Sequence, residues 1–278
     1  MKRAFIWILS FILTLVVAYY QRVTGPTYPV KDSFEINGKQ VEIVYVRSHT
    51  TGTEACVKFV VPDHSINGKI FMRMYPTNEP YVAVDLQRHG DTLIGYIKQL
   101  PPAGKMQYYI TLYDKNGNVV YTRSKEPVII RYKGDVPAYF LIPHILFMFL
   151  AIFLGLTAGL LALFDDLSFR KIQIWTLVSL IIGGFIFGPI VQKYAFGQLW
   201  TGIPFGWDLT DNKTLIAFTA WTIAAILNIK KQRPIAFLIA TLVLYAIYTI
   251  PHSAYGSELN YETGKVTQGF ILSLIGIF

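Results

Sequence analysis

The sequence predicts a mixed fold: an α-helical membrane bundle of five spans joined to an immunoglobulin- or fibronectin-like β-sandwich. Composition is the first reason, because 53% of the 278 residues are hydrophobic and only 15% are charged, whereas soluble domains carry about a quarter charged residues. The second reason is a block of short runs, between residues 30 and 135, in which apolar and polar residues alternate. The third is that basic residues cluster beside the apolar segments.

Residues 1–29 are predicted to be an N-terminal membrane anchor. Lys2 and Arg3 precede an apolar run over residues 4–20, which is short for a membrane span but within range. No small-residue cleavage pattern follows, so we expect an anchor that stays attached and not a signal peptide that is removed. The charged start should remain in the cytoplasm, which sends the next segment to the other side.

Residues 30–135 are predicted to form a periplasmic β-sandwich. Asn-Gly pairs at residues 37–38, 67–68 and 116–117 predict hairpin turns, because Asn and Gly tolerate the positive φ that tight turns require. About seven short strands in about a hundred residues are typical of immunoglobulin- and fibronectin-type domains. The single cysteine, Cys56, cannot form an internal disulfide, so the domain must depend on its own core. The predicted strands cover residues 40–46, 55–61, 69–75, 81–86, 92–97, 106–113 and 127–132.

Residues 136–278 are predicted to form a four-span membrane domain with a long outer loop over residues 188–213. That loop is too polar, and too rich in Gly and Pro, to cross a bilayer. The last ten residues are apolar but too few to cross, so they are expected at the interface or in the outer leaflet. The four predicted spans cover residues 138–164, 172–191, 214–229 and 234–250.

The positions of the charged residues predict the orientation and the location. Basic residues gather in the short segments assigned to the cytoplasm, and the outer loops mix bases with acids, which is the positive-inside pattern. We therefore expect a bacterial inner-membrane protein with its N-terminus in the cytoplasm and the sandwich outside. The location of basic residues beside the membrane spans accounts for the net charge of +8. No nucleic-acid-binding motif is present, so we expect no nucleic-acid partner. The inner bases are Lys2, Arg3, Arg170, Lys171, Lys230, Lys231 and Arg233; the outer ones are Lys193, Lys213 and Lys265.

Polar side chains collect at the predicted outer edge of the membrane domain. An Ile-Pro-His tripeptide occurs at residues 142–144 and again at 250–252, and opposite chain directions would place both histidines at a similar depth. Two imidazoles and several carboxylates at one level are suited to bind a divalent metal, to act as an acid–base pair, or to ligate a haem. No ligand spacing is diagnostic. The candidate metal or haem residues are His144, His252, Asp208, Asp211 and Glu258.

Each of these groups also has a structural interpretation. Asp208 and Asp211 come just before a predicted helix, where N-capping favours them without any catalytic role. A histidine at a membrane edge more often bonds to a helix end or a lipid headgroup than to a metal. The candidate loop or partner contacts Trp200, Trp207 and Tyr194 fit an interfacial aromatic belt.

Two resemblances bear on the architecture. The run LPPAGKMQYYITLYD, residues 100–114, resembles the stretch of fibronectin type III domains in which a Leu-Pro turn leads into an alternating aromatic strand. RYKGDVPAYFLIPHILFMF, FGPIVQKYAFGQLWTGIPFGWDLTDNKTLIAF and IPHSAYGSEL together resemble a group of bacterial inner-membrane proteins without an established activity. Those proteins carry an anchored β-sandwich before a four-span membrane domain, so the resemblance implies that architecture and no reaction.

Three functions stay open at this point. The first is a subunit or scaffold of an envelope complex, in which the sandwich binds a periplasmic partner. The alternative is a metal- or haem-binding enzyme or redox protein with its site at the periplasmic surface. Transport ranks last, because the middle of each predicted span is apolar or small, and ion-coupled transporters keep ionisable groups there. Gly155 and Gly159 instead have the small-x-x-x-small spacing of close helix packing.

Overall fold

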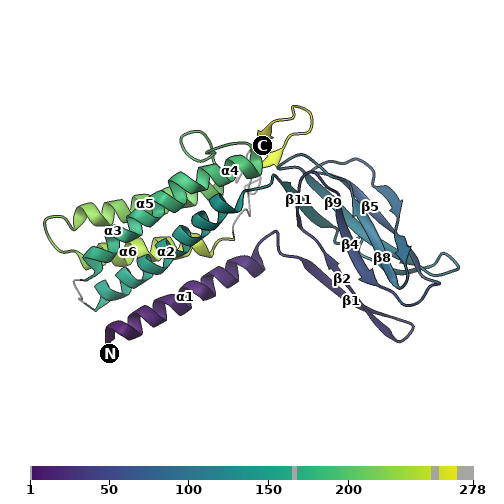
Figure 1. The fold of residues 1–278 in the computed structure, drawn as a ribbon, viewed down its shortest axis with the longest axis horizontal. Helices are drawn as coiled ribbons and strands as arrows, with labels where there is room; N and C mark the ends of the chain where they lie inside the picture. Colours follow the sequence, from purple (N-terminus) through teal and green to yellow (C-terminus); the bar gives the residue numbers. More distant parts are fainter. Residues whose placement is uncertain (1, 165–167, 252–256, 268–278) are drawn as a thin grey trace. The chain divides into compact units, whose positions relative to one another are not determined.

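The chain folds into a helical unit and a β unit. A computed structural model describes residues 2–164, 168–251 and 257–267 (Figure 1). The helical unit takes Met1–Pro26 and Val136–Ser257, and the β unit takes Thr27–Asp135 and Glu258–Val266. The predicted mixed class, with helices and β-sheets in one chain, is therefore confirmed. The C-terminal hairpin belongs to the β unit although it follows the last described helix, so the chain returns to the β unit after leaving it.

Within the described residues, three helices are long and apolar enough to cross a membrane. They are α1 (Lys2–Thr24), α2 (Ala138–Leu163) and the continuous helix Phe169–Phe196. The last two described helices fall short of that measure, because α6 has only 16 residues and the first turn of α5 is polar. Sixteen residues span about 24 Å, against about 30 Å of hydrocarbon. The long helix comprises α3 (Phe169–Leu180), η1 (Ile181–Phe187, a π-helix) and α4 (Gly188–Phe196); α5 is Leu209–Leu227 and α6 is Pro234–Thr249.

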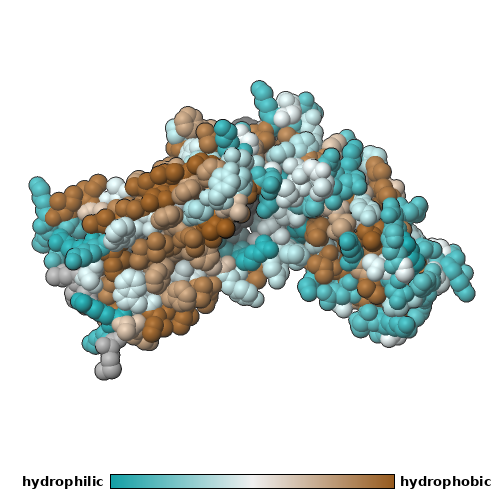
Figure 2. Space-filling view, viewed as in Figure 1, coloured by the Kyte–Doolittle hydropathy of each residue, from teal (hydrophilic) through white to brown (hydrophobic). Residues whose placement is uncertain are grey.

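The buried side of helix α1 combines apolar with small polar residues, and its outward side is apolar. Ser10 is 0% exposed and Thr14 is buried, whereas Ile8 is 60% exposed. Further along the buried side, the Gln21 amide donates to the carbonyls of Tyr248 and Ile250 at the end of α6. Figure 2 shows the matching apolar surface over the visible helices. Polar contacts between helices and apolar side chains outside are what a lipid environment favours.

Helices α2 and α6 pack closely through the glycines of α2. The Thr241 hydroxyl on α6 donates to the Gly155 carbonyl at 3.1 Å. A Cβ at Gly159 would clash with the Thr241 side chain, and a Cβ at Gly155 would meet Leu244. The small residues of this spacing therefore let the two backbones approach, as the sequence predicted. Trp221 of α5 is fully buried in the core that these helices share.

In the described residues, the β unit contains an N-terminal hairpin, the C-terminal hairpin and two larger sheets. The N-terminal hairpin pairs β1 (Val30–Ile36) with β2 (Lys39–Tyr45). One sheet has the strand order β4-β8-β7, and the larger one has the order β3-β11-β9-β5-β6 with β10 paired to β9. The remaining strands are β3 (Ser48–Thr50), β4 (Ala55–Val60), β5 (Asn67–Tyr75), β6 (Val82–Asp85), β7 (Gln87–His89), β8 (Thr92–Ile97), β9 (Lys105–Tyr113), β10 (Val119–Thr122) and β11 (Val128–Lys133).

Buried and more exposed side chains alternate along several strands, so that one side of each of these strands faces the core of the β unit. In β9, Met106, Tyr108 and Ile110 are buried and the residues between them are partly exposed. Each of the seven predicted strands is present, to within two residues at either end. Among the strands up to residue 133, the sequence did not predict β1, β3, β7 and β10, which are short or carry many charged and polar residues, so their alternation is weak.

Two of the three predicted hairpin turns are present and one is wrong. Asn37 and Gly38 have φ values of 50° and 77° and connect β1 to β2. Gly117, with φ of 83°, lies in the turn between β9 and β10. Asn67 and Gly68 instead begin β5, where they pair with β9. A Cβ at Gly68 would come within 2.6 Å of Leu112, so this glycine permits close packing and not a turn.

Candidate functional site

The predicted loop over residues 188–213 is helical at both ends, in α4 and from Leu209 onward, so these parts of the prediction are wrong. The helix that begins at Phe169 continues through Pro189 and ends at Phe196. Proline usually interrupts a helix because it lacks an N–H. Here it follows η1, in which the Gly188 N–H donates to the Gly183 carbonyl, five residues back. In the π-helical turn each N–H donates to the carbonyl five residues back, and this change of pattern comes directly before Pro189, which has no N–H to donate.

His144 of α2 is bonded to this π-helical segment. Its Nδ1 lies 2.8 Å from the Gly183 carbonyl. Because a carbonyl only accepts, Nδ1 carries the proton and Nε2 is the acceptor nitrogen. A Cβ at Gly188 would lie 3.6 Å from His144 Cε1, which is an ordinary van der Waals contact, so the two residues are neighbours. His144 thus has a structural partner, but this partner is a carbonyl inside a helix and not the helix end or lipid headgroup that the structural interpretation expected.

The two aspartates of the candidate site organise the loop before α5. Asp208 is the N-cap of α5, and its carboxylate accepts the N–H groups of Thr210 and Asp211. Asp211 Oδ2 accepts the Thr201 N–H at 2.5 Å and the Thr201 hydroxyl at 3.0 Å. Asp208 therefore caps α5, as the structural interpretation expected. Asp211 lies inside α5 and holds the loop through Thr201.

Burial shifts the pKa values of two groups at the start of α5, outside the long apolar helices. Desolvation raises the pKa of Asp211, although the hydrogen bonds from Thr201 partly oppose the shift. Desolvation also lowers the pKa of Lys213 to about 8, and Asp208 opposes it. The Lys213 ammonium donates to the carbonyls of Ile250 (2.7 Å) and Pro251 (3.2 Å) just beyond α6. A cation at a helix C-terminus is favoured by the helix dipole, so Lys213 joins α5 to the end of α6.

Glu258 lies in the β unit and not with the aspartates of the helical unit. It forms an ion pair with Lys105 of β9. The same hairpin, β12 (Glu258–Leu259) and β13 (Val266–Thr267), places Tyr261 beside the start of β9. The Tyr261 hydroxyl accepts the Lys105 N–H at 2.9 Å and is 2.7 Å from the Lys105 carbonyl, to which it donates. Glu258 thus has a structural partner within its own unit.

The predicted metal or haem site gains no support from the described part of the chain. Within residues 2–164, 168–251 and 257–267, no three His, Cys, Asp or Glu side chains form a group that could hold a metal ion. His252 lies outside the described residues. Of the other four candidates, His144, Asp208 and Asp211 are in the helical unit, and Glu258 is in the β unit.

The three aromatic candidates fall into two environments. Trp200 stacks on Phe185 of η1 with ring centroids 5.4 Å apart, and its indole N–H donates to the Ile203 carbonyl. Tyr194, near the end of α4, has its ring 5.7 Å from that of Phe140. Trp207 is largely exposed at the end of the loop. Trp200 therefore belongs to the packing that holds the loop.

The structure also reveals an aromatic face that the sequence analysis did not single out. Phe71 of β5 and Tyr109 of β9 are directly opposite and stack at 4.8 Å with nearly parallel rings. Tyr81 meets Tyr109 edge-on at 5.0 Å, and the Arg73 guanidinium lies over the Tyr81 ring at 4.5 Å. The outward positions of the predicted strands 69–75 and 106–113 contain Phe71 and Tyr109, so alternation was a usable signal.

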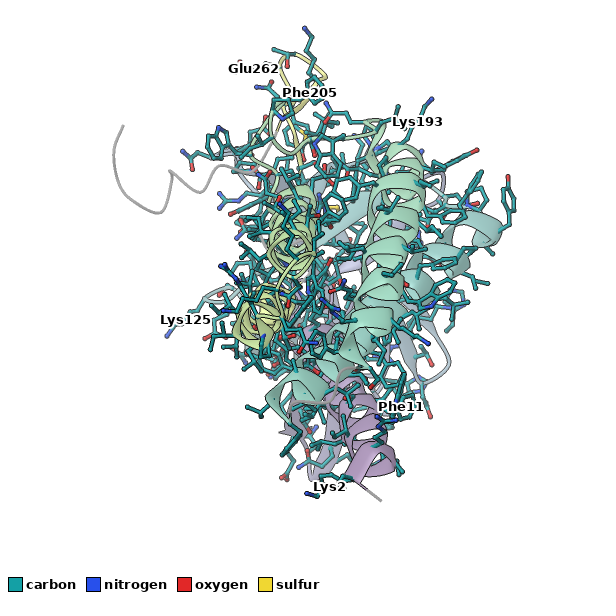
Figure 3. All side chains as sticks on the ribbon, turned by 90° about the vertical axis from the view of Figure 1, so that its left-hand side faces the viewer. Lys2, Phe11, Lys125, Lys193, Phe205 and Glu262 are labelled. Atoms are coloured by element: carbon teal, nitrogen blue, oxygen red, sulfur yellow. The ribbon has the colours of Figure 1, made fainter. Side chains whose placement is uncertain are left out.

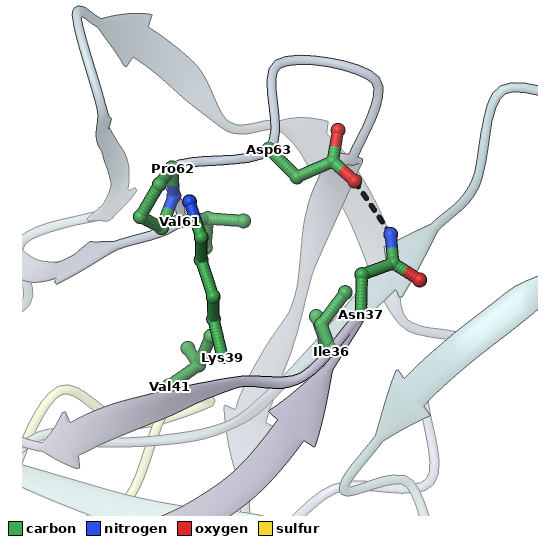
Figure 4. A pocket seen from close by; sticks show the side chains of 7 residues that line it. All are labelled: Ile36, Asn37, Lys39, Val41, Val61, Pro62 and Asp63. Carbon is green, nitrogen blue, oxygen red and sulfur yellow. Dashed lines mark hydrogen bonds between the residues drawn. The ribbon is translucent and has the colours of Figure 1, made fainter.

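A pocket of about 230 Å³ lies at the turn between β1 and β2 (Figure 4). Asn37 donates to Asp63 at 2.6 Å across its edge, and Lys39 extends along it. Bonds from Ser65, and then from Asn37, hold the pKa of Asp63 below its usual value. Ligand pockets usually measure about 300 to 1,000 Å³, so this one is small. No sequence signal beyond the Asn-Gly turn marked it.

Comparison with known proteins identifies no family. No family model matches the chain, and no curated protein matches it. A solved structure titled "Crystal structure of Br derivative BhCBM56" is similar over 36% of this chain and 98% of its own, with 18% identity and a TM-score of 0.25. A TM-score this low carries no argument about the fold or the function of the chain.

Proposed function

We propose that this chain is a five-span protein of a bacterial inner membrane that acts as a subunit or scaffold of an envelope complex. In this proposal, residues 214–229 and 234–250 supply the fourth and fifth spans, and an immunoglobulin- or fibronectin-like sandwich faces the periplasm. The three long apolar helices support membrane association. The clusters Arg170–Lys171 and Lys230–Lys231 support a cytoplasmic location for the turns that contain them.

The observation that carries the proposal is the way the β unit is attached to the helical unit along the chain. The chain passes from one unit to the other after Pro26, after Asp135, after Ser257 and after Val266. The passage after Ser257 leads into the hairpin that Tyr261 and Glu258 fix to β9. A domain that the chain enters and leaves more than once is suited to be held at a membrane and to present a surface to a partner.

The aromatic face formed by Phe71, Arg73, Tyr81 and Tyr109 is the surface that we expect the partner to bind. Its side chains are partly exposed and lie on two central strands and the segment before β6. Tyrosine and arginine are enriched where protein interfaces gain most of their binding energy. The cation–π contact fixes Arg73 in place, so little side-chain entropy would be lost on binding.

Site-specific photo-crosslinking of the full-length protein in its host membrane tests this proposal. A benzophenone amino acid at Tyr109 should give one crosslinked product of defined mass. The same group at Lys58, an exposed residue of β4, should not. Arg73→Ala should weaken the product at position 109. Equal crosslinking at both positions, or none at Tyr109, would contradict the proposed face.

The visible spectrum and metal content of the purified protein test the scaffold proposal against the alternative of a metal- or haem-binding protein. A Soret band, or a stoichiometric metal, that is lost in His144→Ala would replace the scaffold role by a metal or haem site. His144→Ala also breaks the bond to the Gly183 carbonyl. Circular dichroism of the same sample is therefore the control, and it should show that the helices are retained in the variant.

A further inference from the structure

The loop between α4 and α5 exposes large apolar side chains. Phe205 is 78% exposed and Trp207 is 58% exposed. Leu199 and Ile203, in the same twelve-residue stretch from 197 to 208, are also exposed. A loop that faced only water would present polar side chains there, since large exposed apolar patches mark interaction sites.

Polar side chains at the start of α5 are buried and bond to the backbone of this loop. Asp211 and Asn212 of α5 are buried. Asn212 Oδ1 accepts the Ile203 N–H at 2.8 Å, in addition to the bonds from Thr201 to Asp211. A Cβ at Gly202 would come within 2.7 Å of Asp211, so the backbone lies directly on the helix start. The loop is thus fixed from its polar side and presents its apolar side outward.

Continuity along the chain indicates what covers these apolar side chains. The loop begins at Gly197, directly after the helix Phe169–Phe196, which is long and apolar enough to cross a bilayer. The end of such a helix lies where hydrocarbon meets the lipid headgroups. Aromatic side chains are enriched at that level, and Lys193 in the last turn of α4 is suited to contact lipid phosphates. Figure 3 shows Lys193 and Phe205 at the opposite end of the helical unit from Lys2.

We propose that residues 197–207 form a lipid-binding loop that immerses Phe205 and Trp207 in the headgroup region of the leaflet where α4 ends. The occupant is a phospholipid surface, because the exposed residues are apolar and aromatic and continue the end of an apolar helix. The bonds from Asp211 and Asn212 provide the fixed backbone, so immersion requires no refolding of the loop. The loop would set the depth and the tilt of the helix that precedes it.

Single-cysteine labelling tests the loop in the full-length protein. Cys56 is the single cysteine of the sequence, so Cys56→Ala provides the background. Phe205→Cys is labelled with the environment-sensitive fluorophore NBD and reconstituted into phosphatidylcholine vesicles that contain headgroup- or chain-nitroxide lipids. Phe11→Cys, on the outward side of α1, is the control for hydrocarbon, and Asn116→Cys, in the β9–β10 turn, is the control for water.

Immersion predicts that the label at 205 emits at a shorter wavelength than the label at 116. Headgroup nitroxides should quench it more than deep chain nitroxides do, and aqueous iodide should quench it less than the label at 116. Iodide quenching equal to that at 116, without nitroxide quenching, would overturn the proposal. Protection seen only in native membranes and not in pure lipid would overturn it in favour of a protein partner. Leu199→Cys repeats the measurement, should the change at Phe205 disturb the fold.

Discussion

Replacing Tyr261 with Phe tests whether the C-terminal hairpin is a fixed part of the β unit. The change keeps the ring but removes the hydroxyl that accepts the Lys105 N–H at 2.9 Å and donates to the Lys105 carbonyl at 2.7 Å. A net hydrogen bond contributes about 1 kcal/mol, and a stranded buried donor costs about 1 to 3 kcal/mol. We therefore expect the free energy of opening the hairpin to fall by about 2 kcal/mol, which is about 30-fold in the opening equilibrium.

Hydrogen–deuterium exchange of the full-length protein in detergent micelles measures this opening. The informative amides are those of Leu259 and Asn260, which donate to the carbonyls of Ala103 and Lys265. Their exchange should be about 30-fold faster in Tyr261→Phe. Tyr96→Phe removes an exposed hydroxyl of β8 and should leave it unchanged. Unaltered exchange in Tyr261→Phe would refute the idea that the hydroxyl holds the hairpin.

Three further predictions follow from other contacts. Gly159→Val should lower the free energy of unfolding in detergent by about 1 to 3 kcal/mol, seen as a lower thermal unfolding temperature, because the new methyl groups overlap Thr241. Leu163→Val, at an exposed site of the same helix, should leave that temperature unchanged. Asp211→Ala should make residues 197–207 more sensitive to limited proteolysis, since the Thr201 N–H loses its acceptor, and an unchanged cleavage pattern would contradict the clamp. Hydrogen bonds, chiefly from Asn118, hold the pKa of Asp114 below its ordinary value of 3.8. The ionised carboxylate therefore stabilises the fold above pH 3.8, and this contribution is lost as the pH falls further. Asp114→Asn should reduce the acid dependence of unfolding, followed by circular dichroism.

Short-range pattern explains why the strands and the first helices could be predicted. The alternation in residues 106–113 is a property of the pleat itself, because successive side chains point to opposite faces. The apolar runs at residues 4–20 and 138–164 reflect the cost of placing polar groups in hydrocarbon. Both signals need only a window of neighbouring residues, and both correspond to elements of the structure.

Dipeptide signals were less dependable, because neighbours in space decide their role. Asn37-Gly38 forms a turn, but Asn67-Gly68 starts a strand, where Leu112 and Leu86 leave room only for hydrogen at Gly68. Pro189 lies inside a continuous helix, because α4 follows the π-helical segment directly and ends only at Phe196.

For the candidate site, the sequence supplied the residues and only the tertiary structure supplied their partners. Asp208 and Asp211 could be recognised as helix-start residues, since a cap and its helix are adjacent in the chain. The partner of His144 lies 39 residues away, and that of Glu258 lies 153 residues away. Composition and periodicity determined which segments are apolar and which are pleated. Long-range packing decided which polar groups are joined, because hydrogen bonds form between neighbours in space whatever their separation in sequence.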